Sequence, residues 1–113
     1  MKDDDRSASS TRQEKPLTIR KESWYQSRIL KYLAEKYQRA FVWKAAAGPY
    51  SRGGIPDICA VIDGRFYGFE VKRPGGRATA LQVETIRRIN EAGGVAAIVT
   101  TVDDVEKLIR KGE

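Results

Sequence analysis

Residues 53–72, GGIPDICAVIDGRFYGFEVK, contain two apolar runs joined by the dipeptide Asp63-Gly64. Asp-Gly between apolar runs favours a two-residue type I′ turn, because both residues tolerate the positive φ angles that this turn requires. The stretch therefore predicts a β-hairpin with strands over residues 55–62 and 65–72.

The register of this hairpin brings three charged side chains together. In a two-residue turn, Ile62 faces Arg65. The same register puts Asp57 directly opposite Glu70, with Cβ atoms about 4.5–5.5 Å apart. Lys72 falls on their face of the sheet, because side chains along a strand alternate with a period of two. Two opposed carboxylates repel each other, so either a divalent cation such as Mg²⁺ binds them or the three residues form an ordinary ion-pair cluster.

The patterns on either side of the hairpin predict three helices and two more strands. Apolar spacing of three and four residues, a Thr79 capping box and the Gly93-Gly94 pair mark the helices. In chain order, the predicted elements are a helix at 20–38, a strand at 41–45, the hairpin, a helix at 79–92, a strand at 95–100 and a helix at 101–111. The inward face expected for the first helix consists of Glu22, Gln26, Ile29, Leu30, Leu33 and Tyr37. This order predicts an α/β sandwich around a mixed central sheet, with a C-terminal helix.

The composition fits one small intracellular domain. Residues 1–17 are polar and lack hydrophobic periodicity, so they are predicted to be a disordered tail, and residues 18–113 are predicted to fold. No apolar run approaches the roughly 20 residues that a membrane span needs, and a membrane partner is not expected. Cys59 is the single cysteine, which excludes an internal disulfide and favours a reducing compartment, and it is expected to be a buried thiol.

The sequence contains no histidine, which excludes Ser-His-Asp and Cys-His nucleophiles and histidine-ligated zinc. An enzyme of this composition must work with carboxylates, lysine and a hard cation. The net charge is +6, and the charges of residues 1–16 cancel, so the whole excess lies in residues 17–113. A basic domain favours a polyanionic partner, nucleic acid above all, although a solvated basic surface without a partner is the alternative.

Residues 54–57 (GIPD), followed after the hairpin by residues 69–72 (FEVK), resemble the PD-(D/E)XK nuclease signature. More narrowly, residues 22–26 of the first helix, 53–57, 70–72 and Gln82 together resemble the stand-alone VRR-NUC branch, found in phages and bacteria. The resemblance covers about residues 20–100. It implies a restriction-endonuclease-like αβββαβ core, and a cytoplasmic location in a bacterial or phage-infected cell.

The resemblance also implies an activity, that of a metal-dependent deoxyribonuclease, and roles for individual residues. Asp57 and Glu70 would hold Mg²⁺ or Mn²⁺, with the Val71 carbonyl in the same ligand shell. Lys72 would orient the attacking water or stabilise charge that develops on the phosphate. Glu22 would be a further metal or water ligand, and its alternative is an ordinary acidic residue in the first turn of a helix.

Two glutamines belong to the same comparison. Gln82 matches the family's helix glutamine beside the active site, but it is also the fourth residue of the capping box, and the two roles are compatible. Gln26 lies one turn beyond Glu22 on the first helix, where it would contact substrate or merely pack.

Candidate contacts to nucleic acid lie mainly in the loops. Glycines beside them would let the backbone approach DNA closely. The candidates are Lys44, Tyr50, Ser51, Arg52, Arg73 and Arg77. Trp24 and Trp43 are expected to be core or interface residues, with stacking on an unpaired base as the alternative.

The sequence therefore predicts a DNA endonuclease that acts on branched, flapped or junction DNA. A single active site cuts one strand per event, so a symmetric homodimer is expected to supply the second site. Two alternatives remain: a non-catalytic DNA-binding module on the same fold, and a hydrolase directed at RNA or nucleotides.

Overall fold

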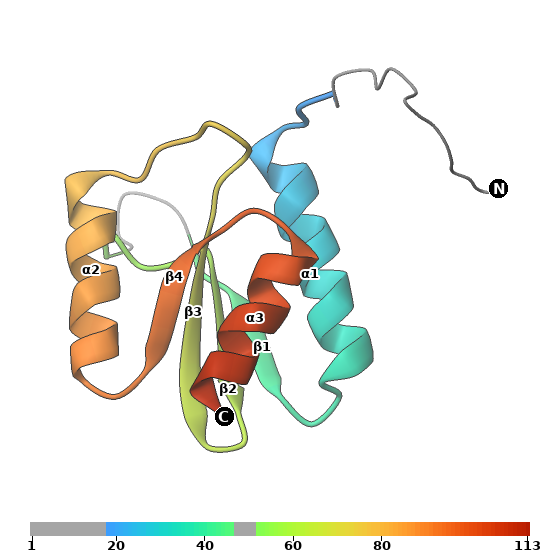
Figure 1. The fold of residues 1–113 in the computed structure, drawn as a ribbon, viewed down its shortest axis with the longest axis vertical. Helices are drawn as coiled ribbons and strands as arrows, with labels where there is room; N and C mark the ends of the chain where they lie inside the picture. Colours follow the sequence, from blue (N-terminus) through green and yellow to red (C-terminus); the bar gives the residue numbers. More distant parts are fainter. Residues whose placement is uncertain (1–17, 47–51) are drawn as a thin grey trace, which may run out of the picture.

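The computed structural model describes residues 18–46 and 52–113 (Figure 1). The tail predicted over residues 1–17 lies outside the described residues. The elements are α1 (Glu22–Lys36), β1 (Phe41–Lys44), β2 (Ile58–Ile62), β3 (Arg65–Val71), α2 (Ala80–Glu91), β4 (Val95–Val99) and α3 (Val102–Gly112). This is the predicted order, and no helix of the described residues is long and apolar enough to cross a membrane.

The four strands form one mixed sheet in the order β1-β2-β3-β4. β2 is antiparallel to both β1 and β3, whereas β4 runs parallel to β3. A parallel neighbour needs a crossover connection, and α2 provides it. Figure 1 shows α1 and α3 together on one side of the sheet and α2 on the other. The predicted mixed α/β architecture is therefore confirmed.

The hairpin has the predicted turn and register. Asp63 has a φ of 50° and Gly64 a φ of 80°, the pair of positive angles that defines a type I′ turn. The ladder runs from Ile62 opposite Arg65 to Ile58 opposite Phe69.

The first strand of the hairpin is shorter than predicted, since β2 begins at Ile58 rather than at residue 55. Pro56 has no N–H to donate to a ladder. Its ring instead packs on Gly68 of β3, where an added Cβ would lie 2.9 Å from the Pro56 Cγ. The chain before β2 therefore crosses the face of the sheet as a loop.

The apolar core lies between the sheet and the pair α1 and α3. The buried residues of these two helices include Ile29, Leu33, Val105 and Ile109. Tyr25 is also buried there, although the predicted inward face of the first helix omitted it. The aromatic ring fits the groove beside the sheet while its hydroxyl accepts a hydrogen bond from the Arg20 backbone N–H.

Three apolar residues are more exposed than their local sequence patterns suggest. The strand predicted at residues 95–100 is the edge strand β4, and its Ile98 is 46% exposed. Trp24 and Trp43 are each 38% exposed and lie outside the core, so of their two expected places the interface stays a prediction. Local patterns identify these residues as apolar, but their exposure depends on where each element lies in the sheet or helix layer.

Candidate active site at the end of the hairpin

Asp57 occupies the point where the hairpin ladder stops. Its side-chain Oδ2 accepts a hydrogen bond of 2.9 Å from the Val71 backbone N–H, and its carbonyl accepts one of 2.8 Å from the Ala45 N–H. The expectation that Asp57 pairs with Glu70 inside the ladder is therefore corrected, because the last ladder pair is Ile58 with Phe69. The Asp57 carboxylate nevertheless lies beside this end of β3.

Glu70 is the most unusual residue of the site. Its side chain is 1% exposed, and neither of its carboxylate oxygens has a hydrogen-bond partner among the described residues. Burial, and then the negative charge of Asp57, raise the pKa of Glu70 to about 7, although Lys72 acts in the opposite direction. A buried carboxylate without hydrogen bonds is costly unless a cation neutralises it.

Lys72 is the cation that the fold itself supplies. Its Nζ lies 3.3 Å from Oε2 of Glu70 and 3.9 Å from Oε2 of Glu22, and its side chain is only 13% exposed. The Lys72 backbone N–H donates to the Val99 carbonyl at 2.9 Å, which fixes the chain as it leaves β3. The structure thus brings Glu70, Lys72 and Glu22 together.

The donor set of this cluster fits a hard divalent cation. Asp57 and Glu70 provide carboxylate oxygens, and neither oxygen of Glu70 is hydrogen-bonded by another of the residues that the structure describes. Mg²⁺ binds through one or two carboxylates together with water and substrate phosphates. Among the described residues, no group of three or more Asp, Glu, Cys or His side chains is close enough to hold a metal. Glu22 therefore reaches Lys72 without completing a three-residue ligand set.

The two glutamines have different surroundings. The Gln82 carbonyl accepts a hydrogen bond of 2.9 Å from the Thr79 N–H, while the Thr79 hydroxyl accepts one of 3.1 Å from the Gln82 N–H. The capping role is confirmed, and a role of Gln82 in the reaction stays a prediction. Gln26 is buried on α1, one turn beyond Glu22, and its contact with substrate also stays a prediction.

The predicted basic contacts lie on the surface near this end of the sheet. Lys44 ends β1 opposite Ile58, and Arg73 directly follows Lys72. Lys44, Arg52, Arg73 and Arg77 are all exposed. The remaining candidates, Tyr50 and Ser51, lie outside the described residues.

The contacts of Trp24 with two arginines were not predicted from the sequence. Trp24 lies between Arg20 and Arg28, whose guanidinium carbons are 5.2 Å and 4.8 Å from its ring centre. The spacing of four residues from Trp24 to Arg28 was the available signal, because residues i and i+4 share one face of a helix. Arg20 precedes α1, so only the folded chain shows its contact with Trp24.

Cys59 is buried, as expected. Burial, and then the charge of Asp57, raise the pKa of its thiol, so this cysteine is not poised as a nucleophile.

A search of solved structures finds a chain described as a VRR_NUC domain, with a TM-score of 0.58 and 24% sequence identity. The match covers 76% of this chain and 95% of the other. No protein-family model matches the chain, and no curated protein matches it. The αβββαβ arrangement and the structural match agree, so this chain has the fold of a VRR_NUC domain.

Proposed function

We propose that this protein is a metal-dependent deoxyribonuclease that hydrolyses phosphodiester bonds. The observation that carries the proposal is the buried Glu70 carboxylate, which lies near the charge of Asp57 and has no hydrogen-bond partner within residues 18–46 and 52–113. A purely structural sheet end gains nothing from two neighbouring carboxylates, one of them buried, whereas a site for a divalent cation uses both. The likeness to a VRR_NUC domain supports the same function.

Asp57 and Glu70 would hold Mg²⁺ or Mn²⁺, together with the carbonyl oxygen of Val71. When bound, the ion would polarise the scissile phosphate and lower the pKa of a water molecule. The chain also keeps the two carboxylates in place without the ion. The Val71 N–H holds Asp57, and burial within β3 holds Glu70.

Lys72 and Glu22 would act on the water and the phosphate. The Lys72 ammonium carries three N–H donors and already lies between the two glutamates. One donor can face Glu70 while another orients the attacking water or contacts the charged phosphate oxygens. Glu22 is half-exposed at the start of α1, where its carboxylate would orient Lys72 or accept a hydrogen bond from water.

DNA would bind across the basic surface around this cluster. The domain has a strong excess of positive charge, and Lys44, Arg52, Arg73 and Arg77 are exposed. Such side chains neutralise phosphates irrespective of sequence, which suits recognition of DNA shape. Branched, flapped or junction DNA is therefore the substrate that we propose.

A non-catalytic DNA-binding module is the second candidate. It would use the same basic surface, but it would gain nothing from two carboxylates that face the phosphates. Glu70 and Asp57 therefore favour the enzyme.

We further propose that the protein is a homodimer. Phe41 of β1 is 69% exposed and lies opposite Val61, which is 39% exposed, on one face of the sheet. The Phe41 ring lies 5.4 Å from that of Trp43, so the three side chains form an exposed apolar patch. Such patches are typical of protein interfaces. Phe41→Arg should convert a dimer into a monomer in light scattering, whereas Val83→Arg, an exposed apolar control on α2, should not.

The test of the function is cleavage of four DNA forms in parallel: supercoiled plasmid, linear duplex, a flapped duplex and a four-way junction. Each is incubated with Mg²⁺, with Mn²⁺ or with EDTA. We expect cleavage with either metal, fastest on the flap or junction, and none in EDTA. Binding of all four forms without cleavage in either metal would instead identify the non-catalytic module.

A further inference from the structure

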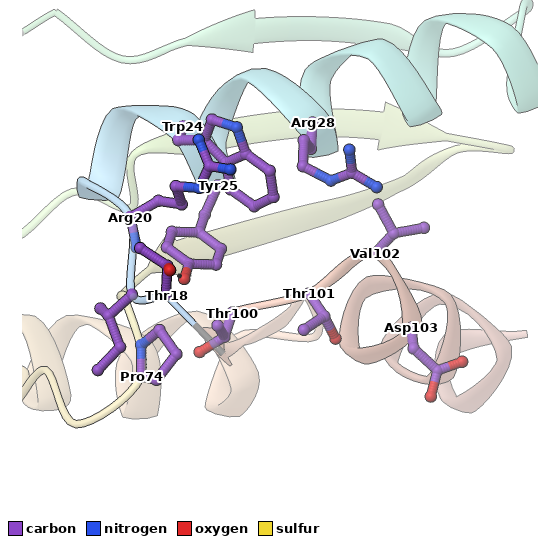
Figure 2. A pocket seen from close by; sticks show the side chains of 11 residues that line it. Thr18, Arg20, Trp24, Tyr25, Arg28, Pro74, Thr100, Thr101, Val102 and Asp103 are labelled. Atoms are coloured by element: carbon purple, nitrogen blue, oxygen red, sulfur yellow. Dashed lines mark hydrogen bonds between the residues drawn. The ribbon is translucent and has the colours of Figure 1, made fainter. Parts of the chain in front are cut away.

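A pocket of about 690 Å³ lies between the N-terminal ends of α1 and α3 (Figure 2). One wall carries Arg20, Trp24 and Arg28, and the opposite wall is the segment from Thr100 to Asp103. Pro74, in the loop after β3, closes one end. Pockets of 300–1,000 Å³ are roughly the size that takes a small organic ligand.

The α1 wall combines an aromatic surface with positive charge. Trp24 is 38% exposed and packs edge-on against Tyr25, with ring centres 5.0 Å apart. Figure 2 shows Arg20 and Arg28 extending to either side of Trp24 in this view. Within residues 18–46 and 52–113, neither guanidinium forms an ion pair. Each guanidinium instead lies over the Trp24 ring, so a base that packs on this ring would displace a guanidinium toward the adjoining phosphate.

The α3 wall offers little to an anion. The Asp104 N–H at the start of this helix donates to the Thr101 hydroxyl at 3.1 Å, so the capping box satisfies it. Asp103 is itself acidic and pairs with Lys107 at 3.4 Å. An anionic ligand would therefore bind at the α1 wall and present its uncharged part to the rest of the pocket.

The pocket adjoins the proposed active site. Trp24 is two residues from Glu22, and Pro74 is two residues from Lys72. Two residues span at most about 7 Å of chain. Glu22 and Lys72 are themselves 3.9 Å apart, so the start of α1 and the chain after β3 contribute both to the pocket and to the carboxylate cluster.

We propose that this pocket binds one unpaired nucleotide of the DNA, with its base against Trp24 and its phosphate at Arg20 and Arg28. A base inside a duplex is stacked on both faces and cannot reach the ring, whereas an unpaired base can leave the stack and pack on an aromatic side chain. The two arginines then contact the adjoining phosphate. The inference rests on the proposed function, because it assumes that DNA crosses the neighbouring carboxylates, and it would make the enzyme select DNA with an unpaired position.

Intrinsic fluorescence tests the contact directly. The chain has two tryptophans, so Trp43→Phe leaves Trp24 as the only one and keeps an aromatic ring beside Phe41. This variant is titrated in EDTA with a flapped DNA and with a blunt duplex of the same length, while anisotropy of labelled DNA reports binding. We expect the flap to quench Trp24 and the duplex to leave its emission unchanged. Binding of the flap without a change in emission, or equal quenching by both, would overturn the proposal.

Affinity gives a second measurement. Trp24→Ala should weaken binding of the flapped DNA by about 5- to 150-fold, the range for loss of one base-stacking contact, and should leave duplex binding nearly unchanged. Val83→Ala is the control, since Val83 is an exposed apolar residue of α2 outside both the pocket and the proposed dimer patch, and it should affect neither DNA. Equal losses for flap and duplex would show that Trp24 does not read an unpaired base.

These measurements need no cleavage. If Trp24 reports the flap in EDTA but no DNA is cut in Mg²⁺, the nuclease proposal fails and the pocket stands. If DNA is cut but Trp24 does not distinguish the flap, the pocket proposal fails and the nuclease stands.

Discussion

Glu70 is the residue whose physical state is hardest to explain without a bound cation. It lies within β3, it is buried, and its oxygens have no hydrogen-bond partner among the described residues. A neutral Gln side chain costs less to bury than a carboxylate whose charge is compensated only by the ion pair with Lys72. In the proposed function, Glu70 therefore lowers the stability of the metal-free fold and in return serves as a metal ligand, a trade that active sites commonly show.

Glu70→Gln should consequently stabilise the metal-free protein while it removes cleavage. We expect the free energy of unfolding in EDTA to rise by about 1 kcal/mol, or roughly 4 °C in Tm. Thermal unfolding followed by circular dichroism measures this shift. Glu22→Gln is the control: its carboxylate is half-exposed, so it should weaken catalysis and leave Tm unchanged. A destabilised Glu70→Gln protein would show that the carboxylate supports the fold.

Lys72→Ala should lower turnover by about 10²–10³-fold, the range for loss of one preorganised electrostatic group. DNA affinity should change little, because the ammonium already faces two glutamates. Single-turnover rates and binding by anisotropy measure the two effects separately. Lys31→Ala, an exposed lysine of α1, is the matched control and should alter neither. Equal losses of rate and affinity would make Lys72 an ordinary phosphate contact.

At the scale of elements, a polar network fixes α1 against α3 and so positions Glu22. Glu106 of α3 accepts hydrogen bonds from the hydroxyls of Tyr32 and Tyr37, and its carboxylate lies 3.1 Å from both Lys36 and Arg110. The hydrogen bond from Tyr32 contributes most to lowering the pKa of Glu106 to about 2. The ionised carboxylate is therefore part of the interface between the two helices.

This network predicts a pH-dependent stability. A carboxyl whose pKa is lower in the folded state stabilises the fold above its unfolded pKa of about 4.5 and loses that contribution as the pH falls toward 2. Glu106→Gln should cost about 1–3 kcal/mol at pH 7 and much less at pH 3. Urea unfolding at the two pH values measures the difference, with Glu35→Gln, an exposed carboxylate of α1, as control. A cost that is the same at both pH values would contradict this account.

The hairpin shows how far an element can be predicted from its sequence. The turn type and register followed from Asp63-Gly64, because that dipeptide has few conformational choices. The start of β2 was not predictable from the sequence, because it depends on the packing of Pro56 against Gly68 of another strand. The alternation of side chains along one strand carries no information about such a contact. Because β2 starts only at Ile58, the Asp57 side chain accepts the hydrogen bond from the Val71 N–H. In a longer ladder, a backbone carbonyl would accept that bond.

At the scale of the whole molecule, the fold and the central cluster were predictable, but the surroundings of the cluster were not. Asp57, Glu70 and Lys72 lie on one hairpin, so local register was enough to group them. The pocket beside them depends on how α1 and α3 pack, and only the assembled fold places Trp24 near Pro74 and Thr101. Apolar patterning alone assigned this tryptophan to a core or an interface.

The most direct test of the central claim is nicking of supercoiled plasmid at matched protein concentration in Mg²⁺ and in EDTA, with the wild-type chain and with Glu70→Gln purified in parallel. The proposed function predicts nicked plasmid only for the wild type in Mg²⁺. Equal nicking in EDTA, or by Glu70→Gln in Mg²⁺, would contradict a mechanism that depends on a cation held by Asp57 and Glu70.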